Sequence, residues 1–229
     1  MSRDKSLCVI VGAGEGLGLS LAKEFSNKGY HVIGLNRSAV ASPDESIDMV
    51  QLDASDNTAC NAVLKQIIDR HGTPAVFIHN TARLYIKPLD ETSVTMFEDA
   101  WQSMVLSAFN TMKIIVPKMA QQSKGTVIVS GATASLKAGA NFSAFSSAKF
   151  ALRGLVQSVA REYQKQGVHI AHVILDGILD TKASRDLHSL DPADMMSTQD
   201  VAEAYLQIVE QKPSAWSHEI DLRPINETF

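Results

Sequence analysis

The chain has 229 residues, 45% of them hydrophobic, which is enough for one α/β domain with a sizeable core over residues 1–229. Its formal net charge of −4 comes without the basic stripe that nucleic acid requires. The two cysteines, Cys8 and Cys60, fall in apolar segments without metal-ligand spacing, which predicts core residues in a reducing compartment.

The first residues are polar and are followed by a short apolar run at 7–11. That run is too short to cross a membrane, and it leads directly into glycines rather than into a signal-peptide cleavage site. We therefore expect a cytoplasmic protein with neither a membrane partner nor a nucleic-acid partner.

Short β-branched runs alternate with longer periodic segments along the chain. The runs predict strands at 7–11, 31–35, 48–52, 75–79, 126–130, 169–174 and 218–222. The periodic segments predict helices at 16–28, 56–71, 95–121, 143–166 and 198–211. This alternation is typical of an α/β fold, with a parallel sheet covered by helices on both faces. Long loops are expected at 81–93 and 176–197, beyond the carboxyl ends of strands, where such sheets bind ligands.

The sequence GAGEGLG lies between the first strand and the first helix. Its glycines, Gly12, Gly14, Gly16 and Gly18, would let the backbone turn tightly and approach a pyrophosphate placed on the free N–H groups of the helix. A tight turn without a ligand is the alternative, but the position at the start of a βαβ unit favours a dinucleotide site.

The second strand ends in Asn36 and Arg37, where a carboxylate would bind the ribose 2′-hydroxyl of NAD. A cation at this place suits a 2′-phosphate instead. Glu15, in the glycine loop, lies close to where that phosphate would sit and therefore favours NAD(H). Arg37 could also be a solvated loop cation. The balance favours NADP(H) over NAD(H).

The spacing of Gly12, Gly16 and Gly18, and a lysine just before RGLVQSVAREY, make the chain resemble the short-chain dehydrogenase/reductase family over nearly its whole length. The resemblance implies a Rossmann-like, doubly wound sheet of seven mostly parallel strands. It also implies a homodimer or homotetramer built on the helices at 95–121 and 143–166, although core packing explains their apolar composition about as well.

The resemblance further implies a set of cofactor contacts. The stretch HNTA resembles the family's Asn-Asn-Ala-Gly, with Ala82 in place of glycine, and Asp176 stands where the family usually has proline. The implied cofactor-binding residues are Gly12, Gly14, Gly16, Leu17, Gly18, Asn36, Arg37, Asp53, Ala54, Asn80, Lys149, Gly177 and Thr181.

Most of the catalytic groups that the resemblance implies are replaced. In such enzymes a tyrosine four residues before the lysine exchanges a proton with the substrate, helped by a serine and an asparagine. Lys149 matches the lysine, but Phe145, Ala132 and Met104 occupy the other three positions. A positioned general acid contributes roughly 10²–10⁴ in rate, so ordinary alcohol–ketone exchange should be badly impaired.

Two functions therefore stay open. One is an oxidoreductase that acts on a small-molecule carbonyl or activated alkene with an unusual proton donor. The other is a catalytically silent cofactor-binding protein that senses redox state or binds a partner. Tyr85 and Asp176 are candidate substitute donors, as are the hydroxyls near Ala132 and Phe145, namely Thr133, Ser135, Ser143, Ser146 and Ser147. Cap, loop and surface roles explain these residues more simply.

Overall fold

The strands form one parallel sheet. In the computed structural model, which describes residues 5–42 and 45–227, the strand order is β3-β2-β1-β4-β5-β6-β7. The chain crosses over between β3 and β4, which brings the ends of β1 and β4 side by side. The strands are β1 (Leu7–Val11), β2 (His31–Asn36), β3 (Ile47–Gln51), β4 (Val76–His79), β5 (Gly125–Ser130), β6 (Val168–Leu175) and β7 (Glu219–Leu222).

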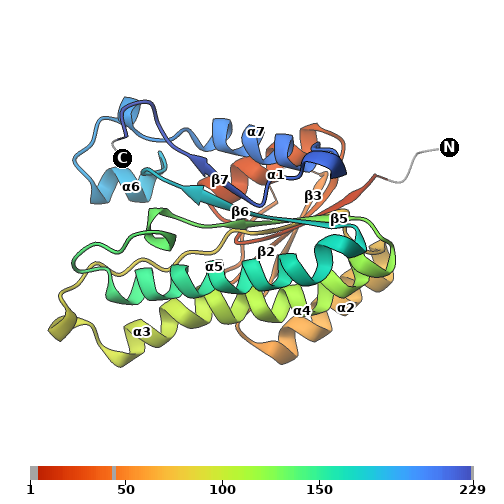
Figure 1. Cartoon of the computed structure of the whole chain (residues 1–229), viewed down its shortest axis with the longest axis horizontal. Helices are drawn as coiled ribbons and strands as arrows, with labels where there is room; N and C mark the ends of the chain where they lie inside the picture. Colours follow the sequence, from red (N-terminus) through yellow and green to blue (C-terminus); the bar gives the residue numbers. More distant parts are fainter. Residues whose placement is uncertain (1–4, 43–44, 228–229) are drawn as a thin grey trace.

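Helices cover both faces of the sheet (Figure 1). One face carries α1 (Leu17–Asn27) and α7 (Thr198–Val209), and the other carries α2 (Asn57–His71), α4 (Ser107–Gln121) and α5 (Ser143–Tyr163). α3 (Val94–Trp101) precedes α4, and the short α6 (Lys182–Leu187) lies in the segment after β6. This is the predicted doubly wound arrangement.

The apolar runs become strands because both of their faces are covered. Every residue of β1, β4, β5 and β6 is buried, as expected for parallel strands between two helical layers. Cys8 and Cys60 are both buried and free, which confirms their predicted place in the core. None of the helices within residues 5–42 and 45–227 is long and apolar enough to span a membrane.

The predicted continuous helix at 95–121 is wrong in one respect. It is divided into α3, a π-helical turn at Gln102–Leu106, and α4. In that turn the Ser103 carbonyl accepts hydrogen bonds from the hydroxyls of Thr81, at 2.6 Å, and Ser107, at 2.5 Å. Such hydrogen bonds to a carbonyl within a helix are typical of local departures from α-helical geometry, which apolar periodicity cannot reveal.

The predicted loop at 176–197 is also more ordered than expected. It contains α6, a 3₁₀ turn at Pro192–Asp194 and a single parallel bridge between Leu179 and Met196. Other predicted boundaries differ by a few residues; the third strand, for example, begins at Ile47 rather than at 48.

Two buried histidines should make the stability of the protein depend on pH. Burial, followed by the nearby charge of Lys149, lowers the pKa of His79 to about 3 and that of His172 to about 4. Below the unfolded value of about 6.5, only the unfolded chain gains these protons, so stability present above pH 6.5 is lost as the pH falls. Between pH 7 and pH 5 the loss should be about 2–4 kcal/mol.

The measurement is the denaturant midpoint across this pH range. His79→Asn should make the midpoint less dependent on pH, because it removes one of the two titrating groups. His188→Asn, which changes a histidine outside the core, is the matched control. Equal pH dependence in all three proteins would contradict this explanation.

Candidate functional site

The glycine turn after β1 is shaped by backbone contacts that no side chain could share. Gly12 has φ +84°, and a Cβ atom there would lie 2.2 Å from the Asn80 carbonyl oxygen. A Cβ atom on Gly18 would lie 2.1 Å from the Gly12 carbonyl oxygen. The turn is thus pressed against both the end of β4 and the start of α1.

The first turn of α1 is open to an anion. No side chain among residues 5–42 and 45–227 caps it, and its first turn carries no acidic residue. Its N–H groups are therefore free for an external acceptor. Leu17 is buried, so it can offer a ligand only its backbone, and Thr181 lies against Gly16 from the segment after β6.

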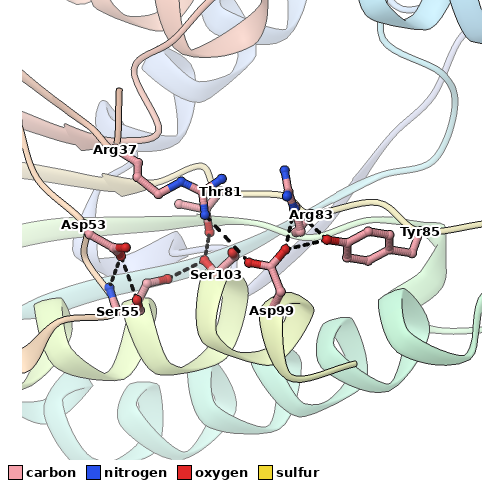
Figure 2. Close-up of polar contacts among 9 residues, drawn as sticks. Arg37, Asp53, Ser55, Thr81, Arg83, Tyr85, Asp99 and Ser103 are labelled. Carbon is pink, nitrogen blue, oxygen red and sulfur yellow. Dashed lines mark hydrogen bonds and ion pairs between the residues drawn. The ribbon is translucent and has the colours of Figure 1, made fainter. Parts of the chain in front are cut away.

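A cavity of about 270 Å³ lies beside this turn, at the carboxyl ends of β1, β2 and β4. Six predicted cofactor residues line it: Gly12, Asn36, Arg37, Asp53, Ala54 and Asn80. The Asp53 carboxylate is held in place by Ser55, whose backbone N–H and hydroxyl both donate to Oδ1 (Figure 2). Sequence reasoning missed four further polar residues of the lining, Ser38, Thr81, Ser103 and Ser107.

Asn80 and Ser130 connect the turn to the rest of the site. Asn80 donates from Nδ2 to the Gly12 carbonyl at 3.2 Å, and its Oδ1 accepts the Ser130 hydroxyl at 2.8 Å. Ser130 also shares a 2.8 Å hydrogen bond with the phenol of Tyr205, which is fully buried between α7 and the sheet.

Lys149 lies on the far side of Ser130, on α5. Only 2% of it is exposed, and its ammonium donates to the carbonyls of Ser130 at 2.8 Å and Thr81 at 3.4 Å. Burial lowers the pKa of Lys149 to about 8. The ammonium is a strong donor near neutral pH and loses its proton in mildly alkaline solution.

The surroundings of Lys149 on the helical side are apolar. Met104 and Phe145 belong to a small cluster with Ala100, Ala144, Ala148, Tyr85 and Val105. The ammonium lies 5.8 Å from the centre of the Phe145 ring, a cation–π distance. Ala132 follows β5, and its N–H donates to the Ser135 hydroxyl. The structure thus places Met104 and Phe145 in one apolar cluster, with the Phe145 ring beside the lysine, and neither side chain can supply a proton.

The candidate substitute donors already have partners. The Tyr85 phenol donates to the Asp99 carboxylate at 2.6 Å (Figure 2). Asp176 is buried, accepts the Thr133 hydroxyl at 2.5 Å, and forms an ion pair with Arg223 at 3.0 Å. Ser147 accepts the indole N–H of Trp101, and Ser135 accepts from Ala132.

Only the hydroxyls of Ser143 and Ser146 are buried without a partner among the described residues. A serine hydroxyl is a much weaker acid than a phenol, so these groups can offer hydrogen bonds more readily than protons.

Comparison with known proteins identifies the family. The model of the short chain dehydrogenases matches residues 6–191, well over half of the chain. The chain belongs to the short-chain dehydrogenase family. An uncharacterized oxidoreductase of Staphylococcus aureus (strain MRSA252) is 24% identical over 230 residues, which cover 96% of this chain and 97% of that protein.

Solved structures of the short-chain dehydrogenase fold match closely. ElxO with NADP bound superposes with a TM-score of 0.87 at 24% identity, covering 96% of this chain and 97% of that chain. A tyrosine-to-phenylalanine variant of ElxO with NADPH bound gives a TM-score of 0.86 at 24% identity, covering 95% and 96%. These similarities confirm the predicted seven-stranded fold.

Proposed function

We propose that this chain works as one NADP(H)-binding unit and passes hydride to a small, already reactive acceptor such as a quinone or an enone. One observation supports this most directly: Gly12 of the glycine turn and Thr81 line the same cavity, and the buried Lys149 donates to the Thr81 carbonyl beside it. The chain has kept groups that hold a cofactor and replaced groups that supply a proton.

The residues present fit a dinucleotide. Gly12 and Gly18 leave backbone where any Cβ would collide, and the uncapped start of α1 suits a pyrophosphate. Asn36 and Arg37 would meet the adenosine ribose, with Asp53 and Ala54 beside the adenine. Asn80, Lys149, Gly177 and Thr181 would hold the nicotinamide half.

Arg37 supports NADP(H) over NAD(H), because its guanidinium is at the end of β2 and lines the cavity. Glu15 is exposed in the glycine turn and would oppose a 2′-phosphate. The binding of NADP and NADPH by ElxO, a protein of the same fold, also supports this preference.

The choice of acceptor follows from the missing phenol. A bound reduced nicotinamide supplies a hydride. If hydride reduces a simple ketone, an alkoxide forms, and this strong base needs a proton from the protein as it develops. Hydride addition to a quinone or enone leaves a phenolate or an enolate, weaker bases that water can protonate afterwards. Phe145 and Met104 are therefore compatible with the second reaction and not with efficient catalysis of the first.

The same apolar cluster favours one other function, that of a catalytically silent NADP(H)-binding protein. Met104 is fully buried in the same cluster as Phe145, and neither side chain can carry a proton. In that case the protein would report the redox state of its cofactor or bind a partner.

Lys149 should make cofactor binding depend on pH. Its pKa is lowered to about 8, so the charged donor is present below that pH and is lost above it. NADPH affinity should fall about two- to tenfold between pH 7 and pH 9.5. Titration of NADPH fluorescence measures this directly. Lys149→Gln should bind more weakly, with little dependence on pH, and a wild-type affinity that stays constant across this range would contradict the assignment.

Single-turnover oxidation of NADPH tests the reaction. Quinones and enones should oxidise bound NADPH, whereas simple ketones should react at least about 100-fold more slowly. A triple variant with Phe145→Tyr, Ala132→Ser and Met104→Asn should gain about 10²-fold or more with ketones. Brisk wild-type ketone reduction with no gain in the variant would overturn the proposed chemistry. Tight NADPH binding without any turnover would support the silent protein instead.

We also propose a homodimer or homotetramer. Leu106 and Phe109 are exposed on the α3–α4 layer, and with Leu155 of α5 they line an apolar hollow. Phe109→Asp should therefore convert the oligomer to monomers in sedimentation velocity. Leu187→Asp changes an exposed leucine on α6 and should leave the oligomer intact. A wild-type monomer at micromolar concentration would contradict this part of the proposal.

A further inference from the structure

Four side chains from three parts of the chain meet around Arg37, which lines the cavity, and the proposed cofactor contacts explain only Arg37 among them. Figure 2 shows Arg37 from the end of β2, Arg83 and Tyr85 from the loop after β4, and Asp99 from α3. Asp99 lies at the centre, because the other three contact its carboxylate.

The two carboxylate oxygens of Asp99 have different environments. Oδ2 accepts the Tyr85 phenol at 2.6 Å and the Arg83 Nε–H at 2.5 Å. Oδ1 is 3.7 Å from Arg37 Nη1, close enough for an ion pair but too far for a hydrogen bond. Arg37 is also the most exposed of the three charged groups, with 53% of its side chain accessible. Arg37 is therefore the side chain that can most easily break its contact with Asp99.

Asp99 remains ionised at neutral pH. Burial raises its pKa, but the hydrogen bonds from Tyr85 and Arg83 and the charges of both arginines more than compensate, so the pKa of Asp99 lies below its ordinary value. The cluster thus holds two guanidinium charges and one carboxylate charge beside a cavity that Arg37 lines.

We propose that Asp99 determines the cofactor specificity of the site by competing with the 2′-phosphate of NADP(H) for Arg37. This inference rests on the proposed cofactor. In the free protein, Asp99 holds Arg37 loosely through Oδ1. When a 2′-phosphate binds at the end of β2, Arg37 pairs with the phosphate instead of Asp99. Arg83 and Tyr85 stay hydrogen-bonded to Asp99 Oδ2. The carboxylate therefore weakens the preference for NADP(H) by repelling the phosphate and by holding its cation.

Removal of the charge at Asp99 should strengthen NADP(H) binding specifically. Asp99→Asn keeps an oxygen for Arg83 and Tyr85 but removes the repulsion, so NADPH affinity should rise about three- to tenfold in 0.1 M salt. NADH carries no 2′-phosphate, and its affinity should change less than twofold. Dissociation constants for both dinucleotides, measured by calorimetric titration, give the comparison.

Two controls separate this role from general effects of charge. Glu98→Gln removes one negative charge from the neighbouring position of α3, but Glu98 lines the apolar hollow rather than the cavity beside Arg37, so both affinities should stay the same. In the Arg37→Gln background, Asp99→Asn should retain less than half of its free-energy effect on NADPH binding, because the competition acts mainly through Arg37.

An unchanged or reduced NADPH affinity in Asp99→Asn, with wild-type NADPH binding intact, would overturn the role of Asp99 and leave the proposed function standing. Failure of the wild-type protein to bind either dinucleotide would overturn both. If the asparagine variant does not fold, Asp99→Ser removes the same charge and should show the same selective gain.

Discussion

The hydrogen bonds of Asn80 and Ser130 hold the carboxyl edge of the sheet together. Asn80 binds the glycine turn through the Gly12 carbonyl, and Ser130 binds both Asn80 and Tyr205 with its hydroxyl. The Ser130 carbonyl in turn accepts the Lys149 ammonium. Strands β1, β4 and β5 and helices α5 and α7 thus meet through two small polar side chains. The glycine turn and the buried cation are therefore held at a fixed spacing whether or not a proton donor lies beside them.

Burying the Lys149 ammonium costs free energy, and the surrounding residues reduce this cost. Lys149 is enclosed with His79 and His172 nearby, and these histidines are neutral because burial and the lysine's charge both disfavour their protonation. Carbonyl oxygens satisfy two of the ammonium's protons, and the Phe145 ring offers a weak cation–π contact. These contacts fit the proposal that Lys149 serves cofactor binding rather than proton transfer.

Local patterns in the sequence predicted much of this molecule. Buried parallel strands read as continuous β-branched runs, and the glycine turn is recognised because sterically demanding backbone contacts permit only glycine at Gly12 and Gly18. Arg37 could be predicted as a cofactor contact because it directly follows a strand, which is also a local feature of the sequence. Contacts between distant segments carry no such signal. Asp99 lies on an exposed helix of mixed composition, and only the folded chain shows that it faces Arg37 and Arg83.

The π-helical turn at Gln102–Leu106 gives this helix one residue more than a regular α-helix would use over the same length. Each residue advances an α-helix by about 100°, so the extra one changes which side chains face inward on either side of the turn. Ser103 and Ser107 both line the cavity, while Met104 packs in the buried cluster with Phe145 and Leu106 is exposed. In a relative without the extra residue, different side chains would face inward even if the amino acids of the helix were nearly the same. Alignments across this helix should therefore allow a gap here before a change of side chain is interpreted as a change of chemistry.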